Sequence, residues 1–359
     1  MDMAKFYILD QNFNTQALLN QFESLLWVER YNSCGDFEIF TYPTPELIQY
    51  AVKNNYIWKS DSEYMMIIEE LELVSTPENG VQFIIRGRSL ESILDRRIIW
   101  NQTRVTSNIQ TSLKRLITEA ITSPIDSSRR IPNFVFQDTT NEYITTTMID
   151  KQYTGDSLLE AVMEICQDNE VGFKVTLNEN NQFVFSLYTG DDRSYKQNEN
   201  PYVVFSPNYA NLMNSNYYES LQGYRNVVLV AGAGEGAARK TRVVGNTSGL
   251  LRRELYADAR DLRDTDENNN PIPDATYYAN LYKRGLEKLL ENEPLEYFEG
   301  EIDTDRLFFY KKDFYMGDIV QVANEFDMEG RARIVEFISS YNTDGIKQYP
   351  TFKIMYEEE

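Results

Sequence analysis

Carboxylates are the residues of this sequence that could do acid–base chemistry, because the chain contains no histidine. It has 56 Asp and Glu against 35 Lys and Arg, which gives a net charge of −21. Without histidine, Ser-His-Asp and Cys-His nucleophiles are excluded, and the commonest transition-metal ligand is missing. Adjacent carboxylates leave a glycosidase-type acid and base open, but so many acids supply such pairs by chance, and solvated surface explains them better. Examples of such pairs are Glu69-Glu70, Asp191-Asp192 and Glu357-Glu358-Glu359.

A glycine-rich segment, residues 231–237 (AGAGEGA), follows an apolar strand in the manner of a dinucleotide-binding turn. That fingerprint requires a helix directly after the turn, whose first amides hold the pyrophosphate. Here residues 238–244 (ARKTRVV) have the composition of a returning strand. The segment therefore predicts a hairpin turn, and we expect no cofactor.

Residues 264–268 (DTDEN) have the oxygen spacing that begins a calcium loop. Position six of that loop is Asn269 instead of glycine, and position twelve is Ala275 instead of a bidentate glutamate. A solvated loop is favoured, and no metal site is predicted. The two cysteines, Cys34 and Cys166, are too few for a disulfide framework, so we expect two free thiols.

Four arginines, Arg86, Arg88, Arg96 and Arg97, lie within a dozen residues of one another. They could bind nucleic acid, or they could pair with Asp and Glu on a neighbouring subunit. The second interpretation suits the planar guanidinium better, since arginine is enriched in bidentate pairs at protein interfaces. The net charge also opposes a surface that binds DNA by neutralising phosphates. We predict a subunit interface at these four residues.

The stretch that carries these arginines, residues 64–100, predicts two strands, a turn and a short helix. Apolar and polar residues alternate in 67–73 and again in 81–85, and residues 76–80 (TPENG) are typical of a turn. Ser89 is predicted to cap a helix that buries Leu90, Ile93 and Leu94. The residues expected inside a barrel are Ile67, Leu71, Leu73, Val81, Phe83 and Ile85.

The secondary structure expected for the rest of the chain changes twice, from strands to an α/β insert and back to strands. Before residue 64, strands are expected at 6–9 and within 22–42, with a helix that starts at Thr44 and buries Leu47, Ile48, Ala51 and Val52. Two helices (108–121 and from Ser157) and a hairpin (173–187) then form an α/β insert. Further expected elements are a strand at 226–230, a helix capped by Asp274 and ended by Glu293-Pro294, and strands at 295–302, 319–322, 331–338 and 351–355.

The chain is long enough for two or three domains, and its many aromatics and short alternating runs favour a β-rich α+β fold. The first hundred residues fit a small β-barrel. The N-terminus lacks the layout of a signal peptide, and no apolar run is long enough to span a membrane. We therefore expect a soluble protein that is made inside the cell.

An ordered set of segments spans nearly the whole chain, and none of its motifs carries chemistry. The segments are 27–31 (WVERY), 35–38 (GDFE), 87–90 (GRSL), 94–100 (LDRRIIW), 226–232 (NVVLVAG), 252–254 (RRE), 258–260 (DAR) and 317–320 (GDIV). Taken in order, this set resembles the hub proteins at the tips of long-tailed bacteriophages. These are similar to the baseplate hubs of contractile phages and to the N-terminal part of tail-associated lysins.

The resemblance implies a homotrimer in which each subunit contributes two β-barrel tube domains, giving a ring with pseudo-sixfold symmetry. Such a ring joins the hexameric distal tail protein to the tip, carries a receptor-binding fibre or spike beneath it, and lets DNA and the tape measure protein pass. Barrels of this kind are assembled from non-contiguous segments. The implied domains are a first β-barrel over 1–104 completed by C-terminal strands, the α/β insert over 105–195, and a second β-barrel region over 196–359 with a helix near 274–292.

The resemblance also implies a virion protein, a structural part of the phage tail made in the host cytoplasm. Tail-associated lysins continue into a peptidase or lysozyme domain, whereas this chain ends directly after hub-like strands at 353–359 (KIMYEEE). With the missing histidines, this predicts a protein that is not an enzyme. The alternatives are a tail-associated cell-wall hydrolase that uses paired carboxylates, and an adhesin whose Tyr and Trp stack on sugars, although core packing explains most of those aromatics.

Overall fold

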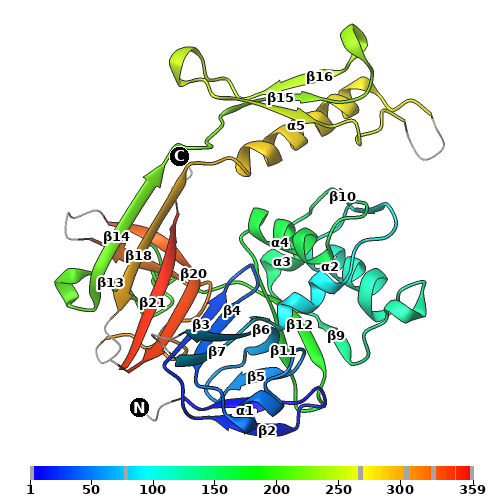
Figure 1. Cartoon of the computed structure of the whole chain (residues 1–359). Coiled ribbons are helices and arrows are strands. Elements are labelled where there is room, and N and C mark those ends of the chain that lie inside the picture. The colour runs from blue at the N-terminus through cyan, green and yellow to red at the C-terminus, as the bar shows by residue number, and fades with distance from the viewer. Residues whose placement is uncertain are drawn as a thin grey trace. The chain divides into compact units, whose positions relative to one another are not determined.

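The computed structural model describes residues 4–76, 80–265, 270–302, 307–324, 329–343 and 345–355. The chain divides into two compact units (Figure 1). The first combines Met1–Asn216 with Phe298–Glu359, and the second is Tyr217–Tyr297. These units have other bounds than the three predicted domains, whose bounds stay a prediction. No helix among the described residues is long and apolar enough to cross a membrane.

One large sheet dominates the first unit, and the β-rich prediction is confirmed. Within the described residues it has 13 strands. They are β1 (Phe6–Leu9), β2 (Thr15–Leu19), β3 (Ser24–Arg30), β4 (Asp36–Thr41), β5 (Tyr56–Lys59), β6 (Met65–Thr76), β7 (Gly80–Ser89), β13 (Val204–Phe205), β14 (Leu212–Ser220), β18 (Leu295–Ile302), β19 (Ile319–Ala323), β20 (Glu329–Asn342) and β21 (Gly345–Ile354). Eleven follow the order β14-β18-β21-β20-β3-β4-β7-β6-β5-β1-β2, and β19 joins β20 to β13.

The two ends of the chain meet in this sheet, where β20 pairs with β3. The antiparallel register runs from Glu336 opposite Arg30 to Asn342 opposite Ser24. β21 continues the sheet beyond β20. Backbone hydrogen bonds therefore join segments that are about 300 residues apart in the sequence, and they fix the C-terminal strands against the N-terminal ones.

The predicted hairpin is confirmed, since β6 and β7 pair antiparallel over their whole length. Its turn at residues 77–79 lies outside the described residues. Of the residues predicted to be buried, Ile67, Phe83 and Ile85 are buried and Leu71 is partly buried. The prediction is wrong for Leu73, which is 57% exposed, and for Val81, which is 45% exposed.

The outer half of the hairpin is exposed because it extends beyond its neighbours in the sheet. β5 pairs with β6 only as far as Ile67, and β4 pairs with β7 only from Phe83 onward. A bulge between Ile68 and Glu70 also shifts the register of the hairpin. Beyond these points no further strand among the described residues pairs with the two-stranded ribbon, so an alternating pattern there does not lead to burial.

The helix after the hairpin is a 3-10 helix, η1 (Leu90–Arg96). Leu90, Ile93 and Leu94 are buried as predicted. The predicted cap is wrong: the Ser89 hydroxyl does not bond the helix amides but accepts a hydrogen bond from the Gly35 N–H at 2.8 Å. The pairing of Asp36 with Arg88 brings Gly35 next to Ser89, so the sheet competes successfully for this hydroxyl.

The first α-helix, α1 (Pro45–Tyr50), begins as predicted, because the Thr44 hydroxyl accepts from the Leu47 N–H at 3.1 Å. Leu47 and Ala51 are buried. The predicted burial of Ile48 and Val52 is wrong, since both are exposed. The helix has six residues and packs on β2, which covers only one narrow face.

The insert contains the predicted helices and hairpin. The elements are β8 (Thr103–Val105), α2 (Ile109–Ile117), the π-helix η2 (Thr118–Thr122), η3 (Ser127–Arg129), β9 (Phe134–Gln137), α3 (Glu142–Thr146), β10 (Lys151–Tyr153), α4 (Leu158–Asp168), β11 (Gly172–Leu177) and β12 (Phe183–Tyr188). The Ser157 hydroxyl accepts from the Glu160 N–H at the start of α4. One apolar cluster joins α2, α4 and β11 to η1, so the insert shares its core with the first part of the chain.

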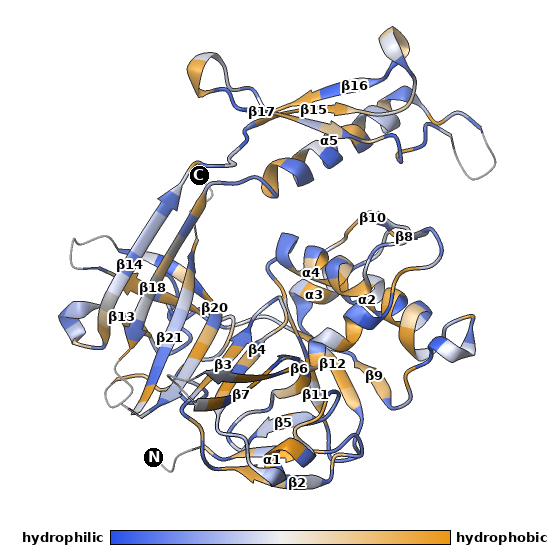
Figure 2. Cartoon of the chain, in the orientation of Figure 1, coloured by the Kyte–Doolittle hydropathy of each residue, from blue (hydrophilic) through white to orange (hydrophobic). Residues whose placement is uncertain are grey.

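The second unit is a small sheet covered on one face by a helix. Its elements are β15 (Val227–Ala231), η5 (Gly236–Ala238), β16 (Thr241–Val244), η6 (Gly249–Leu251), β17 (Glu254–Asp258) and α5 (Asp274–Leu290). Figure 2 shows apolar residues along β15, where Val228 and Val230 pack with Tyr277 and Leu281 of α5. The predicted helix is confirmed, but its N-cap is Pro273, so Asp274 is its first residue and not the cap.

Tyr31 marks the place where three segments of the first unit meet. Its N–H donates to the Val335 carbonyl, and its own carbonyl accepts from the Phe173 N–H. Two glycines lie against the faces of its buried ring, and a Cβ at either Gly172 or Gly317 would lie 2.3 Å from Tyr31 Cε2. This close approach explains why residue 317 is glycine in the GDIV segment.

We expect Gly317→Ala to lower the free energy of unfolding by about 2–4 kcal/mol, because its φ of 89° is left-handed and the new methyl would meet the Tyr31 ring. Gly155→Ala is the matched control, since Gly155 has a φ of 80° and open space around its Cβ. That control should lose only about 1–2 kcal/mol. Urea unfolding followed by circular dichroism measures both, and equal losses would show that the Tyr31 contact does not matter.

Candidate functional site

The predicted arginine group separates into two pairs with different surroundings. Arg86 lies in a row across three strands, opposite Glu38 of β4 and Glu70 of β6. Its guanidinium forms ion pairs with Glu38, with Glu70 at 2.7 Å and with Glu72 at 3.0 Å. The hydrogen bond to Glu38, followed by that to Glu72, raises the pKa of Arg86 further. Its charge is therefore matched within the chain.

Arg88 is matched in the same way. Its Nε lies 2.7 Å from Glu69 Oε2, and its Nη1 lies 3.0 Å from Asp95 Oδ2. Both arginines thus form ion pairs with carboxylates on neighbouring elements. The acids that bind Arg86 lie on β4 and β6, and those that bind Arg88 lie on β6 and η1. An exposed ion pair of this kind contributes little, typically below about 1 kcal/mol, but the row fixes which face of the hairpin is charged.

Arg96 and Arg97 have no carboxylate partner within the described ranges. Arg96 Nη2 donates to Asn54 Oδ1 at 3.4 Å. Arg97 Nε donates to the Arg129 carbonyl at 2.8 Å, and its Nη1 donates to the Arg96 carbonyl at 2.7 Å. Burial, followed by the charges of Arg129 and Arg96, lowers the pKa of Arg97. Because neither arginine pairs with an acid among the described residues, a partner protein could supply the carboxylates. The role of all four arginines in a subunit interface stays a prediction.

Arginines hold both adjacent carboxylate pairs that the structure describes. Glu69 and Glu70 bind Arg88 and Arg86, as above. Asp191 lies 3.1 Å from Arg193, and Asp192 lies 2.6 Å from Arg331. The third run, residues 357–359, lies outside the described residues. The side chains that suggested an acid and base pair serve as ion-pair partners in this fold.

A buried polar network around Glu29 was missed by sequence reasoning. Glu29 is 2% exposed. Its Oε1 accepts from Ser62 Oγ at 2.8 Å, from Lys311 Nζ at 2.9 Å and from Trp27 Nε1 at 3.2 Å. Its Oε2 accepts from Tyr310 OH at 2.9 Å. The only sequence signal is a glutamate inside the apolar run of β3. Two of its partners, Tyr310 and Lys311, lie 281 and 282 residues away.

The nearby charges and hydrogen bonds together affect the pKa of Glu29 more than its burial does. Burial alone would raise the pKa of Glu29, but Lys311, Lys59 and the hydrogen bonds lower it below its usual value. Glu29 is therefore an anion that joins β3 to the segment before β19. A comparable junction forms at Asp318, whose carboxylate accepts from the Asp191 N–H at 2.8 Å and from Arg193 Nε at 2.6 Å.

The glycine-rich segment is a hairpin turn, as predicted. β15 pairs antiparallel with β16, from Val228 opposite Val244 to Ala231 opposite Thr241. The three-residue η5 is the only helical element between these strands. Within the turn, the Ala233 N–H donates to Tyr277 OH at 2.6 Å, so this amide is already used by the helix beneath.

The remaining candidates are a cation loop and the cysteines. Residues 266–269 of the calcium-like loop lie outside the described residues. Among the residues that are described, no group of three or more acidic or thiol side chains could hold a metal ion. Cys34 and Cys166 are both free, as predicted, and both are buried. Burial raises the pKa of each thiol.

Comparisons with known proteins identify a family and several solved structures with a similar fold. A family model described as Siphovirus ReqiPepy6 Gp37-like protein matches residues 5–352. No curated protein matches the sequence. The fold is similar to that of a tail protein from Neisseria meningitidis MC58, with a TM-score of 0.58, 11% identity, and coverage of 98% of this chain and 96% of that one.

Two further structures share the fold. Prophage tail protein gp18 from Listeria monocytogenes EGD-e has a TM-score of 0.53 and 13% identity, with coverage of 97% of this chain and 94% of that chain. A PdpA–VgrG complex described as lidless has a TM-score of 0.50 and 7% identity, with coverage of 99% of this chain and 66% of that chain. This chain thus shares its fold with phage tail proteins and with a complex that contains VgrG.

Proposed function

The chain belongs to the Siphovirus ReqiPepy6 Gp37-like family, and on this basis we propose that it is the structural hub of a phage tail tip. In this proposal three subunits form a ring, and each contributes two β-barrel tube domains. The first barrel comprises residues 1–104 with the C-terminal strands, the insert comprises 105–195, and the second barrel region comprises 196–359. The ring joins the hexameric distal tail protein to the tip and carries a fibre or spike.

The pairing of β20 with β3 is the observation that supports this proposal most directly. It makes one continuous sheet from both ends of the chain, as expected for barrels built from non-contiguous segments. The net charge of −21 suits a conduit for DNA and the tape measure protein, because an acidic wall repels the phosphate backbone. The ion-paired state of the described carboxylate pairs suits a scaffold that is not an enzyme.

Mass photometry of the purified chain, alone and with the distal tail protein of the same phage, tests the proposal. We expect particles of three times the 41.9 kDa subunit mass, and a larger complex when the distal tail protein is added. If only monomers are found at every concentration, even with the distal tail protein present, the ring proposal is wrong.

A further inference from the structure

A pocket of about 470 Å³ opens beside Arg97, between the loop that follows η1 and the end of α2. Apolar side chains contribute much of its lining, among them Ile98, Trp100, Leu116 and Ile125. Three of them are unusually open to solvent: Ile125 is 90% exposed, Trp100 53% and Ile98 46%. Neighbouring exposed apolar groups around a concave surface are typical of binding sites.

The pocket has a rigid edge. The guanidinium carbon of Arg129 lies 4.1 Å from the centre of the Trp100 ring, which is a close cation–π contact. Arg129 Nη2 also donates to the Ile98 carbonyl at 2.6 Å. These two contacts hold the arginine and the aromatic ring in place before any partner arrives, which reduces the entropy that binding must cost.

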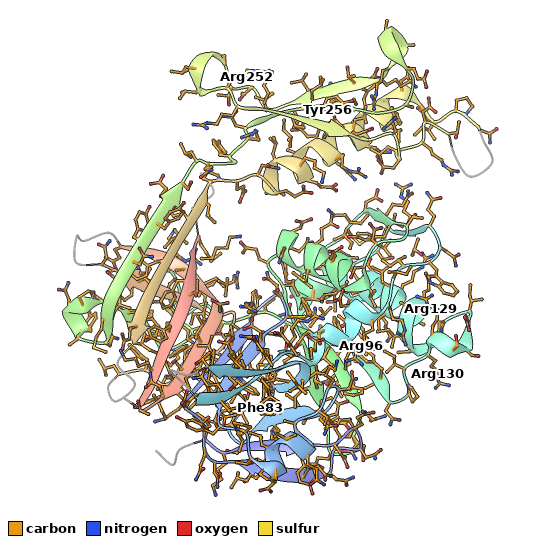
Figure 3. All side chains as sticks on the ribbon, viewed as in Figure 1. Phe83, Arg96, Arg129, Arg130, Arg252 and Tyr256 are labelled. Carbon is orange, nitrogen blue, oxygen red and sulfur yellow. The ribbon has the colours of Figure 1, made fainter. Side chains whose placement is uncertain are left out.

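Positive charge without matching acid surrounds this edge. Arg96, Arg97, Arg129 and Arg130 lie on neighbouring segments, and Figure 3 labels three of them on the insert and the adjoining loop. None of the four forms an ion pair with a carboxylate in the part of the chain that the structure describes. In a chain with 21 more acids than bases, four such arginines together are a local exception.

The acids in and next to the pocket are already bonded. Glu119 lies 2.8 Å from Arg115 Nε and 2.9 Å from Thr103 Oγ1. Asp126 accepts from the Ser128 N–H at 2.9 Å, and the hydrogen bonds from Ser128, followed by the charge of Arg129, lower the pKa of Asp126. Arg129 is therefore partly compensated, whereas Arg96, Arg97 and Arg130 have no carboxylate partner among the described residues.

We propose that this surface binds an acidic protein segment that carries one aliphatic or aromatic side chain. The apolar side chain enters the pocket between Trp100 and Ile125, and the flanking carboxylates pair with the four arginines. Charge complementarity selects the acid, since arginine forms bidentate pairs with carboxylates. The pocket selects the apolar residue. This inference does not depend on the hub proposal, because it concerns only the surface formed by the end of η1, the loop that follows it and the first part of the insert.

Nucleic acid is the competing polyanion, and the observations favour it less. Four guanidinium groups would neutralise few phosphates, while the net charge of −21 repels a long polyanion. Arg129 already covers one face of Trp100, which is the ring on which a base would stack. An isolated apolar side chain uses this pocket better than a charged strand does.

Fluorescence anisotropy with labelled probes on the full chain tests the proposal. The probes are a glutamate-rich peptide with a central leucine, the same peptide with serine in place of leucine, and a single-stranded oligonucleotide of similar charge. We expect the leucine peptide to bind at least about tenfold more tightly than the other two. Trp100→Ala, and separately Arg96→Glu with Arg130→Glu, should each weaken it by about tenfold or more.

Arg242→Glu with Arg253→Glu is the matched control, because it makes the same charge change in the second unit and should leave the affinity unchanged. Circular dichroism verifies that each variant is folded. The proposal is overturned if the leucine peptide does not bind, if the serine peptide or the oligonucleotide binds as tightly, or if the control variant weakens binding as much as the arginine variant at the pocket.

Discussion

Glu29→Ala should lower the free energy of unfolding by about 3–5 kcal/mol, the range observed when one partner of a buried ion pair is removed. The carboxylate accepts hydrogen bonds from Trp27, Ser62, Tyr310 and Lys311. Without it, the Lys311 ammonium loses its only carboxylate partner in the described part of the chain, and the buried donors lose an acceptor. Because these partners belong to the N-terminal and C-terminal segments, the loss weakens their junction.

Urea unfolding followed by tryptophan fluorescence measures the effect, since Trp27 donates directly to Glu29. Lys312→Met is the matched control: Lys312 is exposed and next to Lys311, so this variant should change stability by less than about 0.5 kcal/mol. A double-mutant cycle with Lys311→Met isolates the pair. A loss below about 1 kcal/mol for Glu29→Ala would show that the network does not stabilise the junction.

Local sequence patterns were sufficient to predict most of the helices and strands, because the hydrophobic periodicity that indicates each element lies within about a dozen residues. The alternation in β6 and β7 predicted a hairpin, and the apolar spacing within residues 108–121 predicted the helix that contains α2. Burial at the hairpin tip was not predictable in the same way. Leu73 and Val81 continue the pattern, but β4 and β5 end before reaching them. A strand's period shows which side chains share a face and not whether another element covers that face.

For a similar reason, sequence proximity could not show which of the four arginines are bound by acids within the chain. Arg86 and Arg88 are two residues apart and lie on the same face of β7, but the acids that bind them lie on β4, β6 and the end of η1. Arg96 ends η1 and Arg97 follows it, and Arg97 Nε donates to the carbonyl of Arg129, which is far away in the sequence. Sequence proximity identified the group, whereas the fold decides which of its charges are compensated.

The Glu29 network shows the limit of sequence reasoning most clearly. A glutamate within an apolar strand is a visible exception, yet nothing nearby shows that it is buried and ionised. Its partner Lys311 is 282 residues away and reaches it only because β20 pairs with β3. Buried polar contacts between distant segments depend on the whole topology.

Glu91 gives the second large prediction, a stability that falls as the pH rises. It lies on η1 and is 1% exposed. Its Oε1 accepts from the Val175 N–H of the insert at 2.8 Å, while its Oε2 has no hydrogen-bond partner among the described residues. Burial, only partly offset by hydrogen bonds, raises the pKa of Glu91 to about 7 from the usual 4.5.

The sign follows from the direction of this shift. The folded state binds the proton more tightly than the unfolded state, so the full contribution to stability is present below pH 4.5 and is lost as the pH rises through 7. The span corresponds to about 3 kcal/mol. Other groups that face Glu91 do not reverse this, because Glu29 stays ionised and Tyr64 and Tyr188 have a pKa raised well above 10.

Glu91→Gln removes the titration while keeping an oxygen that can accept from the Val175 N–H. Relative to the wild type, it should gain up to about 3 kcal/mol at pH 9 and gain little at pH 5, as measured by urea unfolding at both pH values. Glu142→Gln, on an exposed residue of α3, should show no such pH dependence. The joint between η1 and the insert is then tightest when Glu91 is protonated, and an equal effect of Glu91→Gln at the two pH values would contradict this.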